Sequence, residues 1–179
     1  AYIGDTALVY LKHYNPKRVH SFELSGKNCE HYKKIMKDNN ISSDRFVINH
    51  IGLSDRRKSV EIDDCGTQST SIHSSGVEVV QLTDIDSYVL EHQLNVGFIK
   101  ADVEGEGLLC AHGMVETIKR NRPVLCLSIY HNPEEFWEIK PFLDNVIVGL
   151  NYKVVIEKHI PFPQRQGEVV LFAYPMELD

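Results

Sequence analysis

The sequence lacks three features that define other protein classes. None of its four cysteines has CxxC spacing, and Cys110 and Cys126 lie in apolar runs, which is typical of reduced thiols. No apolar run reaches the length of a membrane span. Basic residues are the minority, 19 against 25 acidic ones, and the formal charge of −6 opposes a phosphate backbone or an anionic membrane. We therefore expect a cytoplasmic protein with small-molecule ligands and no nucleic-acid or membrane partner.

What the sequence does contain is a regular alternation of strand-like and helix-like segments. The strand-like runs cover residues 18–24, 45–53, 96–103 and 123–130, and the helix-like runs cover residues 27–39, 108–120 and a stretch from Pro133. This rhythm predicts an α/β fold, a mainly parallel sheet with helices on both faces. The last two runs, 152–159 and 168–174, flank prolines and a glycine, which predicts a C-terminal antiparallel hairpin. The length of 179 residues suits one domain, 1–179.

The first residues, AYIGDT, have the form of a turn that leads into a helix. Gly4 allows a close backbone approach, and Asp5 or Thr6 is a candidate N-cap. In a doubly wound sheet such a turn follows the first, central strand, so we expect that this strand is missing and that the domain is N-terminally incomplete. Glu23 closes the next strand-like run, where nucleotide-binding folds carry an acid for the ribose hydroxyls. An ordinary solvated glutamate at a strand end has the same signature.

Polar residues also follow three later strand-like runs. Gly52, Leu53 and Ser54 lie at the end of the run 45–53, at an edge where ligands lie in open α/β sheets. In GFIKADVEGEG, Asp102 and Glu104 stand two apart and point the same way if the strand continues through them. The run PVLCLSIYHN ends near His131, which exchanges a proton near neutral pH. If the two strands are neighbours, these side chains meet at one edge of the sheet.

Two plainer interpretations of these residues stay open. A hydrogen-bonded loop histidine would explain His131 alone, and a strand-to-loop glycine would explain Gly52. A carboxylate pair with a histidine could also hold a divalent cation, but no ligand spacing in this sequence is diagnostic. We therefore predict no metal site.

The run from Gly97 to His131 resembles the core of the FkbM family of S-adenosylmethionine-dependent methyltransferases, whose pattern is roughly I-K-x-D-x-E-G, a helix, then R-P. AYIGDT resembles the latter part of the family's cofactor turn, VHSFEL its strand with the ribose-binding acid, and VVQLTDIDSYV the segment before its fourth strand. The family usually has an acid at the position of Gly107, whereas this chain has Glu106. The resemblance implies a Rossmann-like class I methyltransferase sheet of order 3-2-1-4-5-7-6.

The resemblance also implies roles for individual residues. The resemblance implies that the methionine portion of S-adenosylmethionine is lined by Tyr2, Gly4, Asp5 and Thr6, and that its end lies beside Asp102 and Glu104. It implies that Glu23 holds the ribose and that Leu53 and Ser54 approach the adenine. It implies O-methylation of a sugar or another small-molecule hydroxyl, with His131 as the first candidate for the base and Asp102 as the second. Residues 55–76, a polar loop or short β-excursion, and the loop 159–168 are expected to shape the acceptor pocket.

Two other function classes stay open. A non-catalytic nucleotide-binding or interaction module of the same fold would account for the shifted acid and the missing strand, and it predicts no turnover. A NAD-dependent oxidoreductase shares the glycine turn and the ribose acid, but the chain has no complete GxGxxG, and IKADVEG weighs against it. The sequence indicates neither the acceptor nor the oligomeric state.

Overall fold

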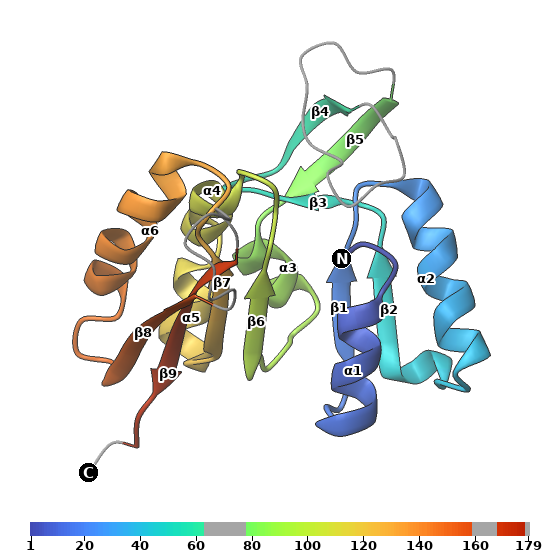
Figure 1. Ribbon diagram of the computed structural model, residues 1–179, viewed down its shortest axis with the longest axis horizontal. Helices are drawn as coiled ribbons and strands as arrows, with labels where there is room; N and C mark the ends of the chain where they lie inside the picture. Colours follow the sequence, from blue (N-terminus) through green and yellow to red (C-terminus); the bar gives the residue numbers. More distant parts are fainter. Residues whose placement is uncertain (63–77, 159–167, 178–179) are drawn as a thin grey trace. The chain divides into compact units, whose positions relative to one another are not determined.

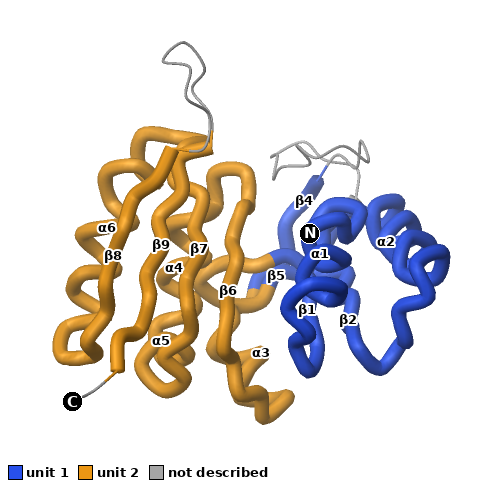
Figure 2. Tube along the Cα trace, turned by 60° about the horizontal axis from the view of Figure 1, so that its bottom comes forward, with its two compact units in different colours: residues 1–52, 58–82 blue, residues 53–57, 83–179 orange. Residues whose placement is uncertain are grey.

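The computed structural model describes residues 1–62, 78–158 and 168–177. The chain forms two compact units, coloured separately in Figure 2. Unit 1 comprises residues 1–52 and 58–82, and unit 2 comprises residues 53–57 and 83–179. The expectation of a single domain over 1–179 stays a prediction.

The described residues of unit 1 form two α-helices, a two-stranded sheet and most of a three-stranded sheet (Figure 1). Its elements are α1 (Asp5–His13), β1 (Val19–Phe22), α2 (Gly26–Asp38), the 3-10 turn η1 (Ser43–Arg45), β2 (Phe46–Asn49) and β4 (Lys58–Ile62); β3 (Gly52–Leu53) and β5 (Glu78–Thr83) lie at its boundaries. Strands β1 and β2 are parallel, with Val19 opposite Phe46. Strands β4 and β5 are antiparallel, so the predicted β-excursion begins at Lys58.

The core of unit 1 is built from the facing sides of its two helices. Helix α2 begins where the Ser25 side chain accepts a hydrogen bond from the N–H of Asn28. Its buried Tyr32 and Met36 are one turn apart, and they pack with Ala7 and Leu11 of α1. All four side chains are less than a tenth exposed, so the polar sequence of α2 hides one continuous apolar stripe.

Gly4, rather than Asp5 or Thr6, is the N-cap of α1, so the predicted cap was wrong. Its φ of +83° lies in the left-handed region that favours glycine. A Cβ at this position would lie 2.6 Å from ring atoms of Tyr32. The close approach that Gly4 permits is therefore one between its own backbone and the tyrosine of α2.

Unit 2 is a four-stranded sheet with its helices. Its elements are α3 (Ile85–Glu91), β6 (Phe98–Ala101), α4 (Gly107–His112), α5 (Val115–Asn121), β7 (Val124–Ser128), α6 (Pro133–Val146), β8 (Tyr152–Lys158) and β9 (Val169–Pro175). The strand order is β6-β7-β9-β8, with β6 and β7 parallel and β9 antiparallel to both neighbours. This is the 4-5-7-6 part of the expected class I order, and it includes the antiparallel pair expected from the last two strand-like runs.

Helices α4, α5 and α6 lie against one face of this sheet (Figure 2). Along these strands, successive side chains alternate between that face and the opposite one. In β6, Ile99 and Ala101 are buried, whereas Phe98 is 42% exposed. Leu125 and Leu127 of β7 continue the buried row into the main core of the unit.

The helical stretch predicted over 108–120 is divided into α4 and α5. The division falls at Gly113, where a Cβ would lie 2.2 Å from the backbone oxygen of Ser54. The carbonyl of Gly113 also accepts the N–H of Asp86. Tertiary contacts, rather than the apolar spacing, therefore end α4.

Two stretches expected to shape an acceptor pocket fall largely outside the described residues. Of 55–76, only the part up to residue 62 is described, and of 159–168 only residue 168. In the parts of the chain that are described, no helix has both the length and the apolar character needed to cross a membrane.

Candidate functional site

The carboxyl end of β6 carries a tight turn rather than a longer strand. The strand ends at Ala101, and the N–H of Glu106 donates to the carbonyl of Val103 at 3.1 Å. The two residues between them, Glu104 and Gly105, have φ of +48° and +100°. The prediction that Asp102 and Glu104 point the same way required the strand to continue through them. The strand ends before both residues, so the turn sets the directions of their side chains instead.

This turn lies beside the end of the neighbouring strand β7. Because β6 and β7 are parallel, with Ala101 opposite Leu127, their carboxyl ends lie at one edge of the sheet. Nε2 of His131 is 3.2 Å from Oδ1 of Asp102 and 3.9 Å from Oε1 of Glu104. These three residues are called the His131 cluster below. The structure thus brings together the three side chains that the sequence placed at one edge.

A fourth residue of this site, Glu135 in the first turn of α6, was missed by the sequence analysis. Its carboxylate is fully buried and lies on the other side of the His131 ring, with Oε2 3.0 Å from Nδ1. Oε2 also accepts the backbone N–H of His131, and Oε1 accepts the N–H of Gly107 at 2.8 Å. The available signal was Asn132, the N-cap, followed three residues later by a glutamate.

The charges of the cluster favour a protonated histidine. The Asp102 carboxylate beside Nε2 and the Glu135 carboxylate beside Nδ1 raise the pKa of His131 to about 10. His131 in turn holds the pKa of Asp102 well below its usual range, with a smaller contribution from Lys100, whose Nζ is 3.3 Å from Oδ2. Burial, followed by the Asp102 and Glu104 charges, raises the pKa of Tyr130 to about 12.

A doubly protonated ring cannot accept a further proton. The side chain of His131 is 10% exposed. Its buried Nε2 makes no well-aligned hydrogen bond within the described residues, and Asp102 lies at ion-pair distance from it. The role of His131 as the first candidate for the base stays a prediction, and its raised pKa favours the protonated form, which donates rather than accepts a proton. In the described parts of the chain, no group of three or more His, Cys, Asp or Glu side chains is arranged to hold a metal ion.

In unit 1, the carboxylate of Glu23 is 7% exposed and is met by four nitrogen donors. The backbone nitrogens of Ala1 and Tyr2 lie 2.8 and 2.6 Å from Oε2. The N–H of Ser25 and the side-chain amide of Asn28 lie 3.0 and 3.2 Å from Oε1. Glu23 thus joins the turn before α1 to the start of α2.

The other residues expected near the cofactor differ in accessibility. In unit 1, Asp5 is exposed, whereas Tyr2 and Thr6 are half-buried. In unit 2, Leu53 packs against the main core, and Ser54 is only 1% exposed. The hydroxyl of Ser54 lies 3.1 Å from Oδ1 of Asp55. The adenine role of Leu53 and Ser54, like the other cofactor assignments, stays a prediction.

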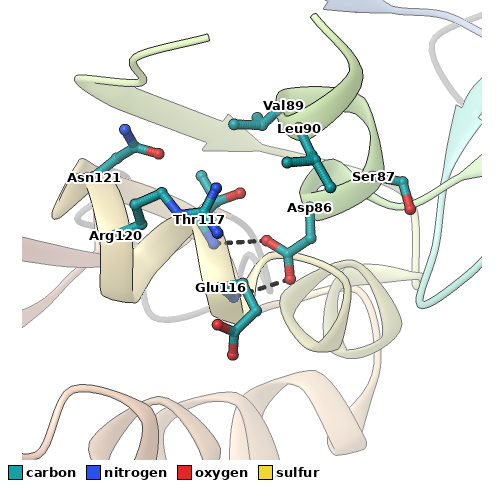
Figure 3. Close-up of a pocket in the computed structure, with 8 residues that line it drawn as sticks. All are labelled: Asp86, Ser87, Val89, Leu90, Glu116, Thr117, Arg120 and Asn121. Atoms are coloured by element: carbon teal, nitrogen blue, oxygen red, sulfur yellow. Dashed lines mark hydrogen bonds between the residues drawn. The ribbon is translucent and has the colours of Figure 1, made fainter. Parts of the chain in front are cut away.

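A pocket of about 210 Å³ lies between α3 and α5 of unit 2 (Figure 3). It is lined by Asp86, Ser87, Val89, Leu90, Glu116, Thr117, Arg120 and Asn121. None of these residues was expected in a site. The Asp86 carboxylate points at the start of α5, where it accepts the N–H groups of Glu116 and Thr117 at 2.9 and 2.7 Å (Figure 3). Asp86 thus caps α5 from a neighbouring helix.

This contact predicts the effect of removing the Asp86 carboxylate. Asp86→Ala leaves two N–H groups of α5 without their acceptor, so it should lower the free energy of unfolding by about 1 kcal/mol. Urea denaturation measures the change. Glu116→Ala is the control, because its side chain is exposed and pairs only with Lys119 among the described ion pairs. Equal losses in the two variants would contradict the capping role.

Residues 1–154 match the family model of the methyltransferase FkbM domain. The chain superposes on methyltransferase FkbM from Methylobacillus flagellatus KT with a TM-score of 0.77 at 17% identity, covering 97% of this chain and 41% of that one. It superposes on an rRNA methylase from Streptococcus thermophilus with a TM-score of 0.54 at 9% identity, covering 98% and 82%.

Identities this low show the fold alone, which is the Rossmann-like α/β fold of class I methyltransferases. The chain spans less than half the length of the Methylobacillus protein. Among curated protein sequences, none matches this chain significantly.

Proposed function

From the premise that this chain belongs to the FkbM methyltransferase domain family, we propose that it transfers a methyl group from S-adenosylmethionine to a hydroxyl of a sugar or another small molecule. The observation that supports this most directly is the His131 cluster. It places two carboxylates, each about one third exposed, at the carboxyl ends of parallel strands β6 and β7. Ligands of open α/β sheets lie at such ends.

Within each unit, taken by itself, there are residues whose chemistry suits a part of this cofactor. S-adenosylmethionine, when bound, supplies a methyl group on a positively charged sulfur. The exposed carboxylates of Asp102 and Glu104 suit the positive methionine end of such a molecule. In unit 1, Glu23 is an acid that follows β1, where nucleotide-binding folds carry the acid for the ribose hydroxyls, and its carboxylate is held in place by nitrogen donors. Tyr2, Gly4, Asp5, Thr6, Leu53 and Ser54 keep the roles that the family resemblance implies.

Methyl transfer to oxygen is an in-line displacement, so alignment of the acceptor accounts for most of what the protein must do. The hydroxyl proton still has to leave, and the acceptor for it in this proposal is Asp102. His131, whose pKa is raised by its carboxylate partners, orients Asp102 in this proposal rather than taking the proton itself. Because a carboxylate with a lowered pKa is a weak base, the proton moves late, after the new C–O bond has begun to form.

Charge supports a small-molecule acceptor rather than RNA. The chain carries 25 acidic and 19 basic residues, and the described edge of the sheet adds three carboxylates around one histidine. Phosphate backbones are bound through clustered Lys and Arg. The superposition on an rRNA methylase, at 9% identity, concerns the fold and does not assign its substrate to this chain.

Calorimetric titration with S-adenosylhomocysteine tests the cofactor and the role of Glu23 together. We expect the protein to bind it, and Glu23→Gln to weaken binding about tenfold or more, because a neutral amide loses charge-assisted hydrogen bonds to two hydroxyls. Glu30→Gln is the matched control, since Glu30 is an exposed glutamate of α2. If neither this chain nor a version extended upstream by the expected first strand binds it, with both folded, a non-catalytic module becomes the better explanation. If both variants bind as the wild type does, the assignment of Glu23 to the ribose is wrong.

A further inference from the structure

We propose that Glu135 is a positioning residue, whose buried carboxylate fixes the His131 ring so that Nε2 faces Asp102 and Glu104. No part of the resemblance or of the proposed function assigns Glu135 a role. Its value for catalysis rests on the proposed function, because the two carboxylates it helps to place are those expected at the reacting groups. The position of the His131 ring itself is set by contacts within unit 2.

The first step is that the Glu135 carboxylate cannot move freely. It is 0% exposed, and its Oε1 is held by the N–H of Gly107 at 2.8 Å. A Cβ on Gly107 would lie 2.6 Å from that oxygen, so the glycine leaves the space that the carboxylate occupies. The N–H of Glu135 itself donates to the Asn132 side chain at 2.8 Å, which fixes the start of α6.

The second step is that this fixed carboxylate holds both the backbone and the ring of His131. Oε2 lies 3.2 Å from the backbone N–H and 3.0 Å from Nδ1. One oxygen therefore holds the Nδ1 edge of the ring close to the residue's own backbone. The ring of Tyr130 packs on the imidazole, with centroids 4.2 Å apart, and restricts rotation further.

The third step is that the ring then faces the turn after β6. Asp102 and Glu104 lie on its Nε2 side, Glu135 lies on its Nδ1 side, and among the described ion pairs Lys100 contacts the cluster at Asp102. Asn132 adds a second link, because its amide donates to the carbonyl of Gly105 within the turn, at 3.0 Å. The first turn of α6 therefore places the loop after β7 and the turn after β6 against each other.

A carboxylate serves this purpose better than an amide would. Carboxylates beside both nitrogens favour a ring that carries protons on both, in which Nδ1–H donates to Glu135 and Nε2 lies at ion-pair distance from Asp102. Replacing Glu135 by glutamine keeps the shape, removes the negative charge and changes one acceptor oxygen into a donor. The ring would then lose the partner that keeps its Nδ1 proton.

The test is the titration of His131, followed by nuclear magnetic resonance of the imidazole nitrogens in the wild type, Glu135→Gln and Glu134→Gln. Glu134 precedes Glu135 in the same turn of α6 and is exposed, so its variant removes the same charge without touching the ring. The signal is assigned by its loss in His131→Gln. We expect both nitrogens to stay protonated in the wild type and Glu134→Gln to about pH 10, and the midpoint in Glu135→Gln to fall by at least about one pH unit.

A second variant covers the case in which Glu135→Gln does not fold. Gly107→Ala keeps the carboxylate but pushes it away from its place, and it should lower the same midpoint. A neutral His131 in the wild type at pH 8, or equal midpoints in the Glu134 and Glu135 variants, would overturn the proposal. The titration needs neither cofactor nor acceptor, so a failed methyltransferase assay and a failed positioning role give separate results.

Discussion

Gly113→Ala should destabilise unit 2 by about 3 kcal/mol or more, because a methyl group has no room at this position. The added Cβ would lie 2.2 Å from the backbone oxygen of Ser54 and 3.0 Å from Cβ of Asp84. Neither neighbour is the free end of a flexible side chain, so relief requires movement of the backbone at residues 53–57 or at the end of α4. For a chain of this length the melting temperature should fall by roughly 6–12 °C.

Thermal denaturation measured by circular dichroism checks this, with Gly97→Ala as the control. Gly97 precedes β6, and a Cβ added there would meet nothing within 4 Å. Its replacement should change the stability by less than about 0.5 kcal/mol. If Gly113→Ala melts together with Gly97→Ala, the contact between Gly113 and Ser54 is not tight in solution, and the break between α4 and α5 needs another cause.

The elements of this fold were largely predictable because apolar runs and their spacing determine them locally. The runs containing Phe98–Ala101 and Val124–Ser128 form strands, and the prolines after His159 separate two antiparallel ones. The errors lie where a distant residue decides. The spacing through Cys110, Met114 and Ile118 continues across Gly113, so no local pattern shows that α4 ends there. The N-cap of α1 is Gly4 rather than the predicted Asp5 or Thr6, and the ring of Tyr32, a residue distant in sequence, lies against that glycine.

The site was predictable to the extent that it follows from strand ends. Parallel strands place Asp102 and His131 at one edge, whichever side chains surround them. The sequence could not show that Glu104 approaches through a turn with positive φ, because glutamate rarely adopts that conformation. Nor could it show that Glu135 turns inward while Glu134 stays exposed, because both are glutamates at the start of one helix and only the tertiary contact with Gly107 distinguishes them.

The stability that His131 contributes should disappear as the solution becomes alkaline. Its pKa is raised from 6.5 to about 10 by Asp102 and Glu135, so between these values the folded state binds one more proton than the unfolded state. The contribution is therefore fully present below pH 6.5 and is lost as the pH rises toward 10, at up to about 1.4 kcal/mol per pH unit. Asp102, whose pKa is lowered, shows the opposite dependence, with a contribution lost only in acid.

Urea denaturation of the wild type and His131→Gln at pH 6.5, 7.5 and 8.5 tests this prediction. The variant leaves three carboxylates around a neutral side chain, so it should be much less stable at pH 6.5, and the difference from the wild type should shrink by up to about 3 kcal/mol by pH 8.5. Groups that do not contact His131 titrate alike in both proteins and cancel in the difference. His92→Gln, which removes an exposed histidine packed on Tyr88, should follow the wild type at every pH.

A constant difference between the wild type and His131→Gln would mean that the folded protein holds His131 neutral. In that case the ring could accept a proton after all, and His131 rather than Asp102 would again be the first candidate for the base.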